Sequence, residues 1–519
     1  MKLYITKAIA IAAALAVFGT GSPRISPSAA DVLRGDLDGD GKVSVEDAQL
    51  TLNAYAQTVA GMDSGLTETQ KAAANVNGDK EVSVEDAQLI LLYYVNNTLA
   101  GTAVTWESLL SPEKPENRFP NSDEQLTVLC WTDDDIHKMF EHFTEAYPQY
   151  KNKVEYWNVG SAGGESREMY ASYFAGNEDV DLYVTEFNWL RDYTDNDEYS
   201  APITDLGFSE SDFSGNYPYT LTIGKNANGV LKAVTWQATP GGYVYRSDLA
   251  KKYLGVSTPE EMQPLVKDWD AFTETAAKLK TASDGKTAMA ATFAGTAFPW
   301  TQGKHSAWTD ADNKLQFGKD AEAFYQRMTS FRKNGYITDA EQWSDDWYTV
   351  GQNDRTLGYF FTTWCLFEGT MLSNVEGDVN GKTYGLYNIT EGPAAWYWGG
   401  AFLTLSPKCN SGKAAHDFIE HFVVNPDTMA SYAEKTGEFV NSSAAMQKVK
   451  RSNPLLGGQS EIAVLDRNAK ALDISENYSR LDYDLSWSFM LAAKSADTYE
   501  DAVLAFKKEA AKTEDLIVE

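Results

Sequence analysis

A stretch of eight residues occurs twice near the start of this chain. Val43–Leu50 reads Val-Ser-Val-Glu-Asp-Ala-Gln-Leu, and Val82–Leu89 repeats it letter for letter, at an offset of 82 − 43 = 39 residues. Repetition at a fixed spacing indicates a duplicated structural unit. This part of the chain is therefore predicted to fold as two similar halves.

An oxygen-rich loop accompanies each copy of the repeat. Side chains at loop positions one, three, five, nine and twelve, with the carbonyl of position seven, can surround a hard divalent cation, as calcium prefers. In the first loop these residues are Asp36, Asp38, Asp40, Lys42 (carbonyl), Ser44 and Asp47. In the second loop they are Asn75, Asn77, Asp79, Glu81 (carbonyl), Ser83 and Asp86. The sequence thus predicts two Ca2+ sites, the second weaker because it has fewer acids and Lys80 in place of the turn glycine.

Both loops resemble EF-hand loops, but they end in Asp rather than Glu and are predicted to lack the preceding helix. A helix is expected after each loop, since apolar residues share one face there: Val45, Ala48, Leu52 and Tyr55 in the first copy, and Val84, Ala87, Leu91 and Tyr94 in the second. Residues 31–100 resemble a type I dockerin, a small all-α EF-hand-like calcium-binding module. The resemblance implies a cohesin domain of a scaffoldin or cell-surface protein as partner. The alternative is a calcium-stabilised intramolecular cap without such a partner.

Residues 1–30 have the features of a secretory signal peptide: a basic start, an apolar run too short to span a bilayer, and small residues before Asp31. Their removal takes the formal net charge from −30 to −33, because they contain three basic residues and no acid. So acidic a chain repels phosphate backbones, which argues against a nucleic-acid partner. We expect a secreted, extracellular protein without direct membrane insertion, held at the cell surface or in a cellulosome by its dockerin-like module.

Residues 101–124 contain three prolines among polar residues and are predicted to form a solvated linker. From residue 125 to 519 the pattern changes to strands alternating with helices. The first segments are a strand at Leu126–Trp131, a helix from Ile136 to Tyr147, a strand at Val154–Val159, a helix at Glu165–Phe174 and a strand at Asp181–Val184. This alternation predicts a mostly parallel α/β sheet with ligands at the strand ends.

Segments of residues 125–519 resemble, in the same order, the family 1 extracellular solute-binding proteins of bacterial ABC importers. They are Phe140–Tyr147, Asp179–Val184, Thr239–Leu249, Leu265–Leu279, Gly358–Trp364, Trp396–Thr404 and Ala414–Met429. The resemblance implies an α/β two-lobed periplasmic-binding-protein-like fold (type II) that closes by hinge motion. It also implies a sugar or oligosaccharide ligand and an ABC permease as a further partner.

Sugar pockets join aromatic walls to a few polar groups. The resemblance places the following residues near the ligand: Trp131, Asp133, Glu186, Trp189, Trp236, Gln237, Trp300, Trp364, Trp398, Gly399, Gly400 and Trp487. Trp364, Trp398 and Trp236 are the leading candidates, and for each tryptophan the alternative is a buried core ring. Five others are assigned to linker, core or surface: Trp106, Trp157, Trp308, Trp343 and Trp347.

Dockerins usually accompany glycoside hydrolases, so a carbohydrate-active enzyme of a cellulosome is the main alternative function. Such an enzyme needs two carboxylates at a set distance, and 74 acidic residues always supply candidates. The sequence contains no Gly-x-Ser-x-Gly, His-Glu-x-x-His or P-loop motif. It therefore favours a binding protein over an enzyme. A third alternative is a structural or adhesive protein.

Overall fold

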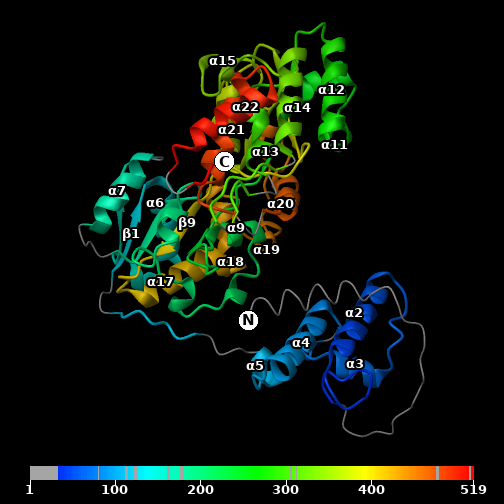
Figure 1. Cartoon of the computed structure of the whole chain (residues 1–519), viewed down its shortest axis with the longest axis vertical. Helices are drawn as coiled ribbons and strands as arrows, with labels where there is room; N and C mark the ends of the chain where they lie inside the picture. Colours follow the sequence, from blue (N-terminus) through cyan, green and yellow to red (C-terminus); the bar gives the residue numbers. More distant parts are fainter. Residues whose placement is uncertain are drawn as a thin grey trace. The chain divides into compact units, whose positions relative to one another are not determined.

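The computed structural model divides the chain into two compact units, Met1–Lys114 and Pro115–Glu519 (Figure 1). It describes residues 33–519 apart from 80, 111–114, 122–124, 132, 161–163, 176–179, 304–306, 311, 319, 475–477 and 514–515. At residues 133, 134, 164–168 and 175 it describes the backbone alone. The predicted signal peptide, residues 1–30, lies outside the described residues.

The N-terminal unit is built from helices. They are α2 (Val45–Val59), α3 (Glu68–Ala74), α4 (Val84–Tyr94), which continues into η1 (Val95–Ala100), and α5 (Trp106–Leu110). Helices α2 and α4 pack against each other, as expected for the helices that follow the two loops. The prediction that neither loop has a preceding helix is wrong for the second loop, which follows α3 directly. Local sequence explains this helix, because Thr67 and Gln70 form a capping box ahead of three alanines.

The predicted linker is shorter than residues 101–124, because α5 packs back onto the N-terminal unit. Trp106 is only 9% exposed and belongs to the core of this unit. Its ring stacks on Tyr93 with centroids 4.2 Å apart and an interplanar angle of 12°. The guanidinium of Arg34 lies 5.5 Å from the centroid of the Trp106 ring. The sequence does not predict this contact, because a single aromatic residue in a polar segment forms no periodic apolar pattern.

The other end of the predicted linker belongs to the larger unit. The Asn117 amide donates to the carbonyl of Gly412 at 2.9 Å, and the backbone N–H of Lys413 donates to Asn121 Oδ1 at 2.6 Å. The N–H of Arg118 donates to the carbonyl of Asp205 at 2.8 Å. Residues 117–121 are therefore bound along the surface of the larger unit.

The larger unit has two lobes, and the first is built on a five-stranded sheet of order β2-β1-β3-β9-β4. Its strands are β1 (Leu126–Cys130), β2 (Val154–Asn158), β3 (Leu182–Glu186), β4 (Ala233–Val234) and β9 (Ala401–Leu405). Strand β1 pairs in parallel with β2 and β3, whereas β9 runs antiparallel to β3 and β4. Its helices include α6 (Asp133–Ala146), α7 (Gly164–Ala175), α9 (Pro218–Gly224), α17 (Gly412–Ile419), α18 (Pro426–Thr436) and α19 (Ser443–Met446).

The second lobe is built on a four-stranded sheet of order β6-β7-β5-β8. Its strands are β5 (Gly241–Arg246), β6 (Ala288–Ala290), β7 (Thr356–Thr362) and β8 (Tyr387–Thr390). Its helices include α10 (Ser247–Leu254), α11 (Pro259–Val266), α12 (Trp269–Ala282), α13 (Phe293–Thr301), α14 (Asp320–Asn334), α15 (Asp345–Thr349) and α16 (Met371–Glu376). The prediction of a mostly parallel sheet is wrong here, because β5 enters from the first lobe and runs against both β7 and β8.

The chain passes between the lobes three times. It crosses in residues 235–240, between β4 and β5, and returns in residues 391–400, between β8 and β9. After α20 (Ile462–Ala471), the helices α21 (Asp482–Ser495) and α22 (Tyr499–Ala510) pack with the second lobe (Figure 1). The predicted two-lobed α/β fold is confirmed. Among the described residues, no helix combines the length and the apolar character needed to cross a membrane.

Candidate functional site

The first two crossing segments run side by side where the lobes meet. The N–H of Trp398 donates to the carbonyl of Thr239 at 3.0 Å, and Thr239 Oγ1 donates to the carbonyl of Gly399 at 2.9 Å. Gly399 and Gly400 have φ values of 81° and 123°, a region that glycine adopts freely. A Cβ on Gly399 would lie only 3.2 Å from Trp364 Nε1. Glycine at 399 therefore permits both the bend and the approach of this tryptophan.

Four aromatic residues gather at this junction and are here called the aromatic cluster: Trp398, Phe298, Trp364 and Trp343. The ring of Trp398 lies 4.3 Å from Phe298, 4.7 Å from Trp364 and 5.8 Å from Trp343, measured between centroids. Trp364 Nε1 donates to the backbone carbonyl of Trp398 at 3.0 Å, which ties the Trp364 indole to the second crossing. Trp364 and Trp398 are half-buried, and Trp343 is 46% exposed. The cluster thus leaves apolar ring surface open to solvent.

A carboxylate of the first lobe lies beside the same crossing. Glu186 ends β3 and pairs with Ala401, and the N–H of the next residue, Phe187, donates to the carbonyl of Gly400 at 2.9 Å. Burial raises the pKa of Glu186. Burial and then the charge of Glu186 raise the pKa of Tyr483, on α21, to about 12. Acid and phenol are therefore close together, and both can hydrogen-bond to a hydroxyl group.

Trp131 and Asp133 follow the carboxyl end of β1, beside β3. Trp131 is half-buried, and its indole N–H has no hydrogen-bond partner within the described part of the chain. Asp133 begins α6, and its side chain lies outside the described residues. Both positions lie at the strand edge where an α/β sheet usually binds its ligand.

Three of the predicted ligand-binding tryptophans are core residues instead. Trp189, Trp236 and Trp300 are 3%, 0% and 6% exposed. Trp300 Nε1 donates to Asp320 Oδ2 at 2.7 Å, and its ring stacks on Phe324 at 4.1 Å. Their prediction as stacking platforms is wrong, because a position near a crossing does not show which way a ring faces. Gln237, at 9% exposure, is buried as well.

Trp487 is half-buried but lies apart from the aromatic cluster. It lines a groove on α21 and α22 together with Leu491, Ala492 and Glu509. None of the four residues of the aromatic cluster lines this groove. Conversely, Trp343 belongs to the aromatic cluster although the sequence did not assign it to the ligand.

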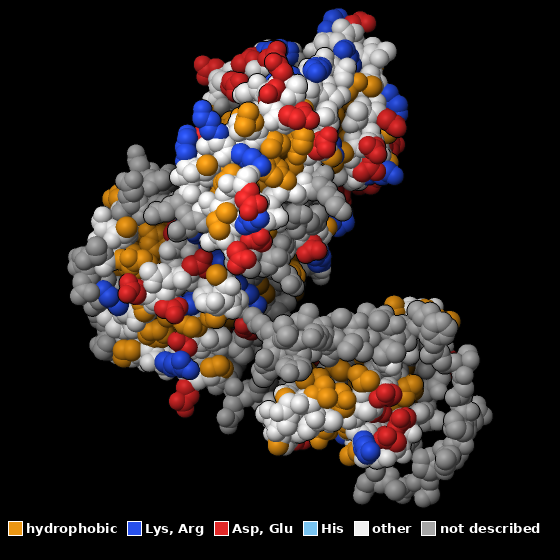
Figure 2. Space-filling view, in the orientation of Figure 1, with side chains coloured by type: hydrophobic (Ala, Val, Ile, Leu, Met, Phe, Trp, Pro, Cys, Tyr) orange, Lys and Arg blue, Asp and Glu red, His pale blue; other side chains and the backbone are white. Residues whose placement is uncertain are grey.

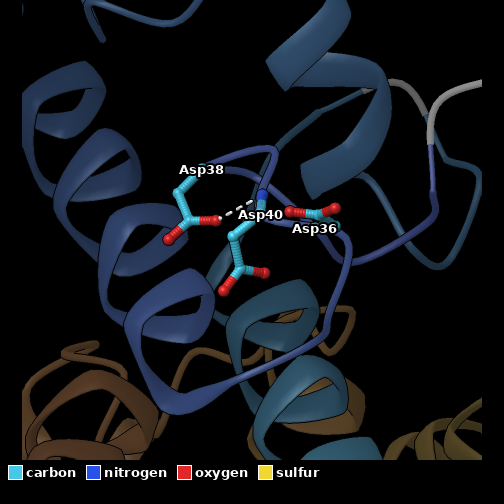
Figure 3. Close-up of side chains that lie close together, drawn as sticks. All are labelled: Asp36, Asp38 and Asp40. Atoms are coloured by element: carbon cyan, nitrogen blue, oxygen red, sulfur yellow. Dashed lines mark hydrogen bonds between the residues drawn. The ribbon is translucent and has the colours of Figure 1, made fainter. Parts of the chain in front are cut away.

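The first calcium loop of the N-terminal unit brings three carboxylates together (Figure 3). Ligand oxygens of Asp36, Asp38 and Asp40 lie within 4.8 Å of one another. The N–H groups of Gly39 and Gly41 donate to the two oxygens of Asp36 at 2.8 and 2.9 Å, which fixes this carboxylate. Burial raises the pKa of Asp38, and the charges of Asp47, Asp40 and Asp36 add to the rise. A bound cation would relieve this repulsion.

The last acid of each loop forms the same contacts in both copies. Asp47 Oδ1 accepts from the N–H of Asp38 at 3.2 Å, and Asp86 Oδ1 accepts from the N–H of Asn77 at 3.2 Å. The other oxygen of each accepts from the N–H of a serine, Ser44 at 2.9 Å and Ser83 at 2.8 Å. Both acids are fully buried. The two loops therefore share one backbone scaffold with different side chains.

The remaining predicted ligands occupy equivalent places. The N–H of Lys42 donates to Asp40 Oδ1, and the N–H of Glu81 donates to Asp79 Oδ1, both at 2.8 Å. Asn75 Oδ1 accepts from the N–H of Gly78 at 2.8 Å. The oxygen donors of the first loop fit a hard cation such as calcium. In the second loop two donors are neutral amides, so the fit is weaker, and Lys80 lies outside the described residues.

Comparison with known proteins identifies the larger unit. The profile described as bacterial extracellular solute-binding protein matches residues 138–455. The chain belongs to this family. Since the family consists of extracellular binding proteins, the predictions of a binding protein rather than an enzyme, and of an extracellular location, are confirmed at that level. The match leaves the N-terminal unit uncovered, so its dockerin assignment stays a prediction.

Solved structures share the fold of this solute-binding protein at low sequence identity. A family 1 extracellular solute-binding protein is 15% identical, with a TM-score of 0.64, and the match covers 75% of this chain and 99% of the other. Maltose-bound MalE3 of T. maritima is 18% identical, with a TM-score of 0.52 and coverages of 74% and 98%. The ABC transporter associated binding protein of B. animalis subsp. lactis Bl-04, in complex with β-1,6-galactobiose, is 20% identical, with a TM-score of 0.51 and coverages of 75% and 97%. No curated protein matches the chain.

Proposed function

We propose that the larger unit binds a sugar or short oligosaccharide at the junction of its lobes and closes on it by hinge motion. The observation that carries this proposal is the pair of half-buried indoles, Trp364 and Trp398, at the crossing that leads into β9, the strand whose first residue, Ala401, pairs with Glu186. A pyranose ring has an apolar C–H face, which stacks on indoles, and hydroxyl groups, which bind carboxylates. Gly399 and Gly400 give the second crossing the backbone freedom that a hinge requires.

The solved relatives support this ligand class and a transport role. Two of them hold a disaccharide, maltose or β-1,6-galactobiose, and one is described as associated with an ABC transporter. By analogy, an ABC permease is proposed as the partner that receives the ligand. The alternative of a glycoside hydrolase requires that a bound oligosaccharide be cut.

Titration of the full chain with maltose, β-galacto-oligosaccharides and cello-oligosaccharides tests the proposal. We expect calorimetry to show binding, and Trp364→Ala or Trp398→Ala to weaken it about tenfold or more, since each removes a stacking surface. Trp487→Ala is the matched control, because this half-buried indole lines the groove on α21 and α22, to which the aromatic cluster does not contribute. Release of reducing ends, or equal affinity in all four proteins, would show that the proposal is wrong.

We also propose that the N-terminal unit is a dockerin-like module that binds calcium in both loops and attaches the protein to a cohesin. The carboxylates of Asp36, Asp38 and Asp40 support calcium binding. Exposed Leu50 and Leu52 on α2 and Leu92 on α4 support a protein partner, since they are 38%, 46% and 41% exposed. Figure 2 shows hydrophobic side chains gathered on a face of this unit beside acidic ones.

Calcium titration of the full chain tests the metal sites, and cohesin domains immobilised on a sensor test the partner. Asp40→Asn should remove the tighter site and Asp79→Asn the weaker one, because each deletes one anionic ligand. Cohesin capture should disappear when calcium is chelated. Calcium binding without any cohesin capture would favour the intramolecular cap instead, and the absence of calcium binding would refute the module assignment.

A further inference from the structure

Trp343 occupies a backbone position that tryptophan ordinarily avoids. The N–H of Ser344 donates to the carbonyl of Glu341 at 3.0 Å, which closes a β-turn with Gln342 and Trp343 at its centre. Trp343 has a φ of 71°, whereas Gln342 is not among the residues with positive φ. This combination is the pattern of a type II turn, in which the third residue is normally glycine or asparagine.

The other residues of this kind show how unusual the choice is. In the described part of the chain six residues other than glycine have positive φ, and all except Trp343 are Asn or Asp. The short polar side chains of Asn and Asp tolerate this conformation, whereas a bulky side chain is strained in it. Strain of this kind persists where the surroundings impose it, and it concentrates at functional sites.

Packing of the Trp343 ring explains the strain only in part, because 46% of the residue is exposed. Its ring contacts two tryptophans, Trp347 at 5.1 Å and Trp398 at 5.8 Å between centroids. Trp347 is a buried residue, whereas Trp398 is half-buried at the junction of the lobes. The turn therefore places a half-exposed indole next to the proposed ligand surface.

Contacts on both sides of Trp343 hold the turn in place. Ser344 caps α15, since its Oγ accepts from the N–H of Trp347 at 3.2 Å. On the other side, the Glu341 carboxylate forms an ion pair of 2.6 Å with Lys494 on α21. The turn is thus anchored to α15 and α21, and the indole of Trp343 is presented from a fixed backbone.

We propose that Trp343 is a ligand-contacting residue, and that its strained turn sets its indole beside Trp398 and Trp364 to complete an aromatic wall for a pyranose ring. This proposal rests on the sugar-binding function proposed above and adds a residue to that site. The strain is retained because glycine or asparagine would relax the turn but remove the ring. Three indoles offer more stacking surface than two, which favours a ligand of more than one sugar unit.

The test measures both the stability and the ligand affinity of Trp343→Asn. Asparagine tolerates the positive φ of this position but lacks the ring. We expect the melting temperature of the free protein to fall by no more than about 5 °C, because the relief of backbone strain offsets part of the packing lost against Trp347 and Trp398. Affinity for the oligosaccharide that binds the wild type best should fall about tenfold. Trp343→Phe keeps an aromatic face and should retain most of the affinity.

Two results would overturn the proposal. Unchanged affinity in Trp343→Asn would show that the ring does not touch the ligand, and a melting temperature many degrees lower would show that the ring serves packing. A wild type that binds no sugar refutes the proposed function together with this inference. A wild type that binds sugar alongside an unaffected variant refutes this inference alone.

Discussion

A buried histidine pair in the first lobe should make the larger unit lose stability below neutral pH. His142 Nδ1 and His421 Nε2 lie 2.8 Å apart, and His142 Nε2 lies 3.1 Å from Ser431 Oγ. The two histidines are 6% and 1% exposed, and Phe143 and Phe422 pack against them. A proton on His421 would therefore add a charge with little water to solvate it.

The pKa of His421 gives the sign and size of the effect. Burial, and then the neighbouring His142, lower the pKa of His421 to about 4, whereas an unfolded histidine has a pKa of about 6.5. Because the folded pKa is the lower one, the contribution to stability is complete above pH 6.5 and is lost as the pH falls towards 4. Between pH 7 and pH 5 this linkage amounts to about 2 kcal/mol of unfolding free energy.

Urea unfolding of the wild type and of His421→Gln at pH 7 and pH 5 measures this quantity. The glutamine amide can still hydrogen-bond to His142 but does not titrate, and other titrating groups, such as the Lys435–Glu145 pair beside His142, are common to both proteins. Tryptophan fluorescence reports the larger unit, because Trp106 is the only one of the 14 tryptophans outside it. The wild type should lose about 2 kcal/mol more than the variant. Equal losses would refute the reasoning.

Two further substitutions test packing. Trp106→Ala should lower the unfolding free energy of the N-terminal unit by about 3 kcal/mol, because it leaves a cavity between Tyr93 and Gly35. Hydrogen exchange of the α4 amides measures this loss. Unchanged protection would mean that α5 does not stabilise the unit. Gly241→Ala should lower the unfolding free energy of the larger unit by about 1–3 kcal/mol, because the new Cβ would overlap the Trp396 ring. A melting temperature equal to that of the wild type would contradict this packing.

The sequence predicts best those features that depend on residues close together in the chain. The ligands of each calcium loop lie within twelve residues of one another, so their spacing alone predicts that the carboxylates of Asp36, Asp38 and Asp40 lie close together. The helix before the second loop was missed, although its capping residues, Thr67 and Gln70, are visible in the sequence. The alternation of strands and helices predicted an α/β sheet, whereas the two lobes were implied by the resemblance of short segments, in their order, to the family of solute-binding proteins.

The orientation of single side chains is what the sequence does not reveal. Trp236 lies in the first crossing and Trp364 contacts the second, yet Trp364 is half-buried at the junction whereas Trp236 is fully buried, because orientation depends on contacts with distant segments. Trp343 does not belong to a periodic apolar pattern. Its position directly before Ser344, the N-cap of α15, is nevertheless a signal that the tryptophan lies in a turn.

Residues 117–121 determine which lobe of the larger unit is directly connected to the N-terminal unit. Asn117, Arg118 and Asn121 bind to the first lobe, through Gly412, Asp205 and Lys413, whereas the C-terminal Glu519 forms an ion pair with Lys314 of the second lobe at 2.7 Å. The N-terminal unit is thus joined by the chain to the first lobe and not to the second. If a partner holds the N-terminal unit, as proposed above, the second lobe is the one that moves relative to the attachment point when the lobes close.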